Sequence, residues 1–141
     1  MIKIQEKDFN IEDEINQIKS QHLNVGAVST FIGYVRSLNN QQKVSSINLD
    51  VYKDMAYKTL EDISAKAQKK WDIIDMLIIH RFGKLNVEEK IVLVAIFSMH
   101  RKESSDACNF IMDYLKKDAP FWKKEYYNDN YEWLENIRLR N

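Results

Sequence analysis

The feature that most constrains this chain of 141 residues is a near-continuous apolar run from Ile91 to Met99. A run of this length is far too short to cross a bilayer as a helix, which takes about 20 residues. It is typical of a β-strand that is buried on both of its faces. The sequence therefore predicts a central strand of a sheet over 90–99.

Period-two alternation and β-favouring side chains predict further strands around this one. Their ranges are 2–9, 26–36, 47–52, 73–80 (ending near Gly83) and a short one at 123–127. The polar stretch from Ser37 to Ser46 is predicted to be a loop. A tail that carries Trp133 finishes the chain.

Three segments repeat apolar residues at spacings of three and four, which is typical of amphipathic helices. A short helix is predicted over 11–20, and two longer ones carry the stripes Ala56, Leu60, Ile63, Ala67 and Ala107, Phe110, Ile111, Tyr114, Leu115. Asp54 is expected to cap the first long helix, and Pro120 to end the second by Ala119. Strands and helices mix without strict alternation, so the prediction is an α+β fold in a single domain over 1–141.

Charge and cysteine content exclude several classes of function. The 21 basic and 21 acidic residues leave a formal net charge of zero, so the chain lacks the global positive field of a nucleic-acid-binding protein. Cys108 is the single cysteine, and it is expected to be a small buried hydrophobic residue. The three histidines lack metal-ligand spacing, so no metal or cofactor is expected. The first residues contain no apolar signal-peptide segment, which predicts a cytoplasmic protein without a membrane span.

Local clusters of basic residues are the candidates for an anion site. Arg36 is expected at the end of a strand beside the polar loop, and His100-Arg101 between the apolar strand and the start of a helix. Free backbone N–H groups and the helix dipole favour an anion at such a helix start, and arginine binds phosphate with two parallel hydrogen bonds. The alternative is a surface His-Arg pair without a ligand.

Lys116 and Lys123 lie on either side of the predicted helix end at Pro120. Phe121 and Trp122 are expected to wall a pocket that partly desolvates Lys123, which lowers the pKa of a lysine and makes it usable in proton or group transfer. The alternative is a solvated basic face near a helix C-terminus. His80-Arg81, the second His-Arg pair, is interpreted as structural, with an anion role left open.

Several motifs occur in the order and spacing of a known family. They are Gly26-Ala27-Val28 with Gly33-Tyr34-Val35-Arg36, Ile79-His80-Arg81-Phe82-Gly83, Ser98-Met99-His100-Arg101, and the stretch from Phe110-Ile111-Met112-Asp113-Tyr114-Leu115-Lys116 to Ala119-Pro120-Phe121-Trp122-Lys123-Lys124-Glu125. From Gly26 to Trp133 the chain resembles the large, catalytic subunit of molybdopterin synthase. The resemblance implies an α/β-hammerhead-type fold with a mixed or antiparallel sheet and two main helices.

The same resemblance implies a sulfurtransferase. It would act as a homodimer within a heterotetramer, with a small ubiquitin-like subunit whose C-terminal Gly-Gly tail carries a thiocarboxylate. The substrate would be cyclic pyranopterin monophosphate (precursor Z), which two sulfur transfers convert to molybdopterin for the molybdenum cofactor.

Site residues carried over by position are the catalytic Lys116 and Lys123, with a substrate pocket whose members are Tyr34, Val35, Arg36, His100, Arg101, Lys124 and Glu125. In the family this pocket is built across the dimer. Two positions depart from the family pattern. Ile137 stands where relatives commonly have arginine, with Arg138 next to it, and Tyr34 stands where relatives often have lysine.

Three rival functions stay open at this point. The first is a non-catalytic phosphate- or nucleotide-binding module, which would bind anions without sulfur chemistry. The second is a sulfurtransferase that carries a persulfide on Cys108, although a reactive thiolate needs an exposed and electropositive position. The third is a purely structural dimer partner.

Overall fold

The computed structural model describes residues 1–39, 42–118, 120–127 and 130–135. Within these ranges the chain forms strands and helices in the following order: β1 (Ile2–Gln5), α1 (Ile11–Lys19), β2 (Ala27–Tyr34), β3 (Leu38–Asn39), β4 (Gln42–Lys43), β5 (Ser46–Val51), α2 (Lys53–Lys70), β6 (Asp75–Arg81), β7 (Gly83–Asn86), β8 (Lys90–Ser98), α3 (Arg101–Asp118), β9 (Phe121–Tyr127) and β10 (Asn130–Glu135).

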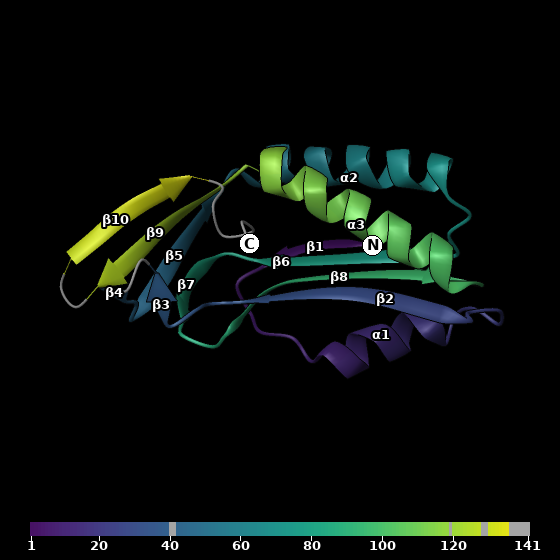
Figure 1. Cartoon of the computed structure of the whole chain (residues 1–141), viewed down its shortest axis with the longest axis horizontal. Coiled ribbons are helices and arrows are strands. Elements are labelled where there is room, and N and C mark those ends of the chain that lie inside the picture. The colour runs from purple at the N-terminus through teal and green to yellow at the C-terminus, as the bar shows by residue number, and fades with distance from the viewer. Residues whose placement is uncertain (40–41, 119, 128–129, 136–141) are drawn as a thin grey trace.

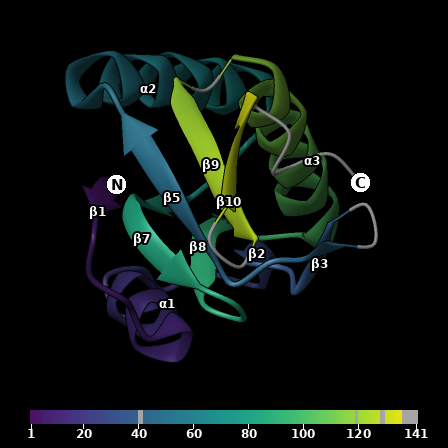
Figure 2. The same cartoon turned by 90° about the vertical axis from the view of Figure 1, so that its left-hand side faces the viewer.

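Two four-stranded sheets organise the chain (Figure 1). The first has the order β1-β6-β8-β2; β1 is parallel to β6, and the other neighbours are antiparallel. The second has the order β10-β9-β5-β7 and is antiparallel throughout. Figure 2 shows this second sheet from its side of the molecule, with β5, β7 and β9 in front of the first sheet.

The apolar run forms β8, an inner strand of the first sheet, and it is buried on both faces as predicted. Val92, Val94 and Ile96 belong to the core cluster that includes α2 and α3 residues. The alternate residues, for example Leu93 and Phe97, belong to the cluster that includes α1. Figure 1 shows the corresponding layers, with α2 and α3 on one face of the sheet and α1 on the other.

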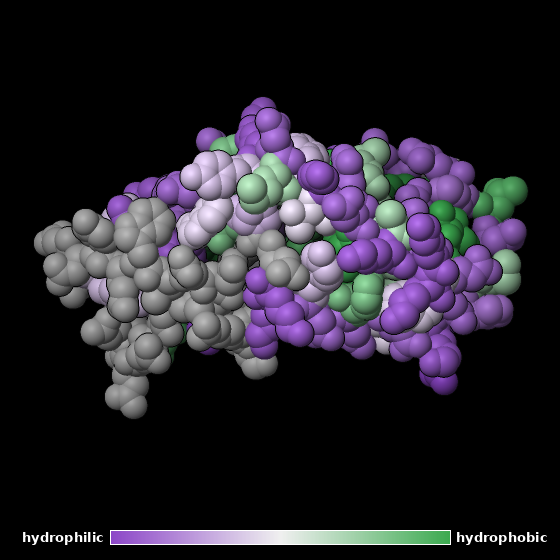
Figure 3. Space-filling model, turned by 90° about the horizontal axis from the view of Figure 1, so that it is seen from above, coloured by the Kyte–Doolittle hydropathy of each residue, from purple (hydrophilic) through white to green (hydrophobic). Residues whose placement is uncertain are grey.

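The two long helices bury most of the predicted apolar stripes, and Phe110 and Tyr114 of α3 are half-buried against the core. Leu60, Ile63 and Ala67 of α2 are fully buried, as is Ile111 of α3. The outer side of this layer is largely hydrophilic in Figure 3, with small apolar areas between the charged side chains. No helix within the described residues is long and apolar enough to cross a membrane.

The structure also corrects several predicted boundaries. The predicted loop contains the short hairpin β3–β4, and the predicted tail contributes β10. Asp54 does not cap α2; it lies in the first turn, and the N-cap is Tyr52, without a side-chain cap bond. β1 ends at Gln5, and β9 begins at Phe121 rather than at Lys123. The differences in the strands arise because pairing with distant strands supplies backbone hydrogen bonds that local patterns do not reveal.

β7 was not predicted. It follows Gly83, whose φ of +86° turns the chain out of the first sheet and into the second. Such a left-handed conformation favours glycine. The turn lets one continuous segment, β6 followed by β7, contribute a strand to each sheet.

Candidate active site between the two sheets

Lys123 lies on the inward face of β9. Side chains alternate along this strand, so Phe121, Lys123 and Glu125 are buried while Trp122 and Lys124 are half-buried on the opposite face. Lys123 is only 6% exposed. Burial of an ammonium group is costly unless it is compensated, and Glu125 places an opposite charge on the same face of the strand.

Phe121 and Trp122 were predicted to wall the Lys123 pocket. Phe121 shares the inward face of β9 with Lys123, although it is not among the residues that line the cavity there. Trp122 points to the other face, where its ring meets Tyr52 edge-on with centroids 4.9 Å apart. The prediction for Trp122 was wrong because it ignored the period-two alternation of a strand that starts at Phe121.

A small cavity brings several predicted residues together. Its lining consists of Tyr34, Val35, Arg36, Ile47, Ile91, Lys123 and Glu125. Five of these seven were predicted from the sequence. Ile47 and Ile91 were missed, because only the strand order brings β5 and β8 beside β9 and the end of β2.

A larger, open hollow of about 610 Å³ adjoins this cavity and shares its lining residues Tyr34, Val35 and Arg36. Ser37, Leu38 and Glu88 complete its lining. Arg36 is exposed, whereas Val35 is buried. The Tyr34–Arg36 segment therefore separates the buried Lys123 from an accessible surface.

Backbone geometry fixes this segment. The pairing of β2 with β8 shifts register between Gly33 and Tyr34, which marks a bulge. Beyond it, the Val35 N–H donates to the Glu89 carbonyl at 3.0 Å, and the Glu88 N–H donates to the Val35 carbonyl at 2.9 Å. Bulges commonly redirect side chains beside active sites.

Lys116 lies in the last turn of α3, just before the chain enters β9. It is half-buried, while its neighbour Lys117 is exposed. Neither cavity, as bounded by the described residues, includes Lys116. Lys124 is half-buried on the outward face of β9, so it is likewise separated from the Lys123 cavity.

His100 and Arg101 occupy the strand end and helix start that the sequence predicted. Both are exposed. The Ser98 hydroxyl donates to the His100 carbonyl, and the Ser104 hydroxyl donates to the Arg101 carbonyl at 3.1 Å. These bonds fix the backbone at the start of α3.

Within a single chain, His100 and Arg101 lie far from Lys123. Tyr34 pairs with Lys90 at one end of β8, and Ala27 pairs with Ser98 at the other. A strand of nine residues spans on the order of 27 Å. The predicted site residues therefore form two groups, at opposite ends of the first sheet.

Cys108 is buried in the core, as predicted. Burial raises the pKa of its thiol to about 11. A thiol in this state is a poor nucleophile, which argues against a persulfide carrier at this position. Among the described residues, no group of His, Cys, Asp and Glu side chains forms a metal site. Arg138 lies outside the described residues.

Comparison with known proteins gives a consistent result. The family model described as MoaE protein matches residues 4–118. A protein of Ralstonia nicotianae named molybdopterin synthase catalytic subunit is 47% identical over 95% of this chain and 76% of its own length. A Pseudomonas aeruginosa protein of the same name is 42% identical over 95% of this chain and 89% of its own.

Solved structures agree on the fold. The molybdopterin biosynthesis MoaE protein from Burkholderia ambifaria superimposes with a TM-score of 0.84 at 39% identity, covering 96% of this chain and 89% of that one. Molybdopterin synthase from Staphylococcus aureus superimposes with a TM-score of 0.84 at 30% identity, covering 94% of this chain and 95% of that one. A complex of subunits 1 and 2 of molybdopterin-converting factor from Helicobacter pylori shares the fold at 19% identity. Its TM-score is 0.79, covering 94% of this chain and 88% of that one. The α+β prediction is thus confirmed, and this chain belongs to the MoaE protein family.

Proposed function

We propose that this chain is the catalytic subunit of a molybdopterin synthase and transfers sulfur to cyclic pyranopterin monophosphate. The sulfur donor would be the C-terminal thiocarboxylate of a small ubiquitin-like subunit. The observation that carries the proposal is the buried Lys123, in one cavity with Tyr34, Arg36 and Glu125, in a chain 47% identical to a relative of that name.

The chemistry of the two groups of residues suits both reactants. The thiocarboxylate and the pterin phosphate are anions, and arginine and histidine bind such groups through charge-assisted hydrogen bonds. A lysine beside the reacting carbonyl can stabilise a tetrahedral oxyanion or protonate a leaving group. We assign Lys116 to the partner's terminal carbonyl and Lys123 to the pterin.

The open hollow at Tyr34–Arg36 offers a route for the partner's extended tail. It is bordered by Ser37 and Leu38 and adjoins the Lys123 cavity. Extended peptides bind readily in grooves of this kind. The two-subunit complex among the structural relatives is consistent with such a partner.

We further propose that two copies of the chain complete each site. β2 is an edge strand of the first sheet among the described strands, and edge strands readily pair with another chain. Antiparallel pairing of β2 with a symmetric copy would bring the Tyr34 end of one chain beside the Ala27 end of the other. Ala27 pairs with Ser98 of β8 within one chain, and His100 and Arg101 follow β8. They would therefore approach the partner copy's Arg36.

Reconstitution tests the proposed reaction. The wild-type protein is mixed with thiocarboxylated small subunit and precursor Z, and the pterin is analysed by mass spectrometry. We expect the pterin to gain two sulfur atoms. A folded protein that binds the partner and the pterin but adds no sulfur would favour the non-catalytic binding module instead.

A further inference from the structure

His80 connects the two sheets through an aromatic stack. Its ring lies on Phe121 with centroids 3.6 Å apart and an interplanar angle of 16°. Both side chains have no exposed surface. His80 belongs to β6 of the first sheet and Phe121 to β9 of the second, so the stack fixes one sheet against the other.

The orientation of the His80 ring is fixed as well. Nδ1 lies 2.8 Å from the carbonyl oxygen of Arg81, which can only accept, so Nδ1 carries the proton and donates. Phe121 is held by this ring two residues before Lys123, on the same face of β9. A shift of the stack would therefore move Lys123.

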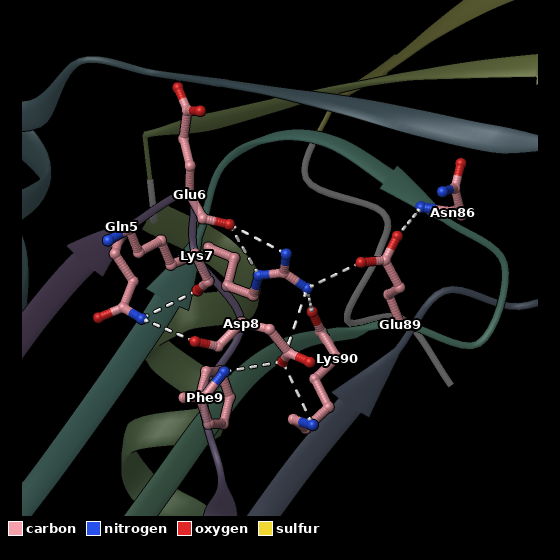
Figure 4. A network of polar contacts seen from close by, with 9 residues as sticks. Gln5, Glu6, Lys7, Asp8, Phe9, Asn86, Glu89 and Lys90 are labelled. Atoms are coloured by element: carbon pink, nitrogen blue, oxygen red, sulfur yellow. Dashed lines mark hydrogen bonds and ion pairs between the residues drawn. The ribbon is translucent and has the colours of Figure 1, made fainter.

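Arg81, the next residue, is bonded to the β8 backbone that pairs with Tyr34, a lining residue of the cavity. Its guanidinium donates to the Glu6 carbonyl through Nε at 3.1 Å and Nη2 at 2.9 Å, and to the Lys90 carbonyl through Nη1 at 3.0 Å. Lys90 is the β8 residue that pairs with Tyr34. Figure 4 shows the groups around this guanidinium, including Asp8 and Glu89.

The charge of Arg81 is thus compensated within the chain. Its side chain is 6% exposed, and the Glu89 and Asp8 carboxylates lie 3.4 Å and 3.8 Å from Nη1. A guanidinium bound in this way has little capacity for an external anion. This arrangement favours the structural interpretation of the His80-Arg81 pair over an anion site.

We propose that His80 and Arg81 are positioning residues for sulfur transfer, an inference that rests on the function proposed above. His80 holds Lys123 through Phe121 and β9. Arg81 holds Tyr34 through Lys90 and β8. Two adjacent residues of β6 thereby set the spacing between the lysine and the Tyr34–Arg36 wall, without touching the substrate.

The test compares His80→Leu, which removes the ring, with His80→Phe, which keeps a stack but loses the bond to the Arg81 carbonyl. Ile18→Ala serves as the control, because Ile18 is also buried, at 4% exposed, and belongs to the α1 cluster, away from β9. Each variant is assayed for the kcat and KM of sulfur transfer and, separately, for the rate at which an amine reagent labels Lys123. Thermal unfolding of each variant confirms that it is folded.

We expect His80→Leu to lower kcat at least tenfold and to change the labelling rate of Lys123. In His80→Phe, both kcat and the labelling rate should return most of the way to the wild-type values. Phe121→Leu should resemble His80→Leu, and the double variant should be no worse than either single change, because both remove the same stack. If His80→Leu alters kcat and labelling no more than Ile18→Ala does, the positioning role is wrong. If His80→Leu does not fold, unchanged kcat and labelling in Phe121→Leu would overturn it equally.

The labelling measurement needs no partner or pterin. If wild-type protein transfers no sulfur, the proposed function fails. The labelling rates still decide whether the stack positions Lys123.

Discussion

The carbonyl oxygen of Met99 occupies the space next to Gly26 where any other residue would carry its Cβ. An ideal Cβ at Gly26 would lie 2.1 Å from that oxygen. The Gly26 N–H also donates to the Ser98 carbonyl at 3.0 Å. Gly26 thus holds the backbone that leads directly into His100 and Arg101.

Replacement of Gly26 by alanine should displace this segment, because the clash is with backbone. We expect Gly26→Ala to lower the free energy of unfolding by about 1–3 kcal/mol, measured by urea denaturation. Gly33→Ala is the comparison, since its Cβ would meet the Val92 side chain at 3.0 Å, a milder contact. Equal losses in the two variants would contradict this explanation.

Lys116 and Lys117 form a natural pair for testing the catalytic assignment, because they are adjacent on α3 and differ in burial. Lys116→Ala should slow sulfur transfer by about 10²–10⁴-fold, the range typical of a lost acid–base or oxyanion-stabilising group. Lys117→Ala should leave the rate unchanged. Normal turnover by Lys116→Ala would show that the assignment is wrong.

Cys108 should be chemically inert. With a pKa of about 11, its thiolate fraction near pH 8 is about 100-fold below that of an ordinary cysteine, so alkylation by iodoacetamide should be slower by at least that factor. Cys108→Ala should retain sulfur transfer. Loss of activity in a folded Cys108→Ala protein would revive the persulfide mechanism.

Asp8 should make stability depend on pH. The N–H of Phe9 is the main cause that holds the pKa of its carboxyl below the usual value, with Lys90 and Arg81 adding to the effect. A depressed folded-state pKa stabilises the fold above the unfolded pKa of about 3.9, and this contribution is lost as the pH falls through the folded value. The stability difference between wild type and Asp8→Asn should therefore be present at pH 7 and shrink below about pH 4. A difference that stays constant across this range, in urea denaturation, would refute the linkage.

Much of this architecture could be predicted from local pattern. The stripes of α2 and α3 have the period of a helix, and the near-continuous apolar run that forms β8 is typical of a strand buried on both faces. The positions of the site residues depend on pairing between distant strands. No local signal places Ile47 and Ile91 beside Lys123. The orientation of Trp122 does follow from local alternation, once the strand is known to begin at Phe121.

The His80–Phe121 stack illustrates the same limit. Each residue is part of a recognisable motif, yet 41 positions separate them in the chain and only the meeting of two sheets brings their rings together. The sequence likewise predicted Arg36, His100 and Arg101 as site residues. Their separation along β8 became visible only in the structure.

The central claim is that sulfur transfer occurs at sites to which each of two copies contributes one half. Its most direct test is a mixed dimer of Arg101→Ala and Lys116→Ala chains, isolated with two different affinity tags. Each variant alone should be inactive. The mixed dimer should contain one intact site and regain about half of the wild-type rate, measured as sulfur gained by the pterin. A mixed dimer as inactive as its parents would show that these residues act within a single chain, or not in this reaction.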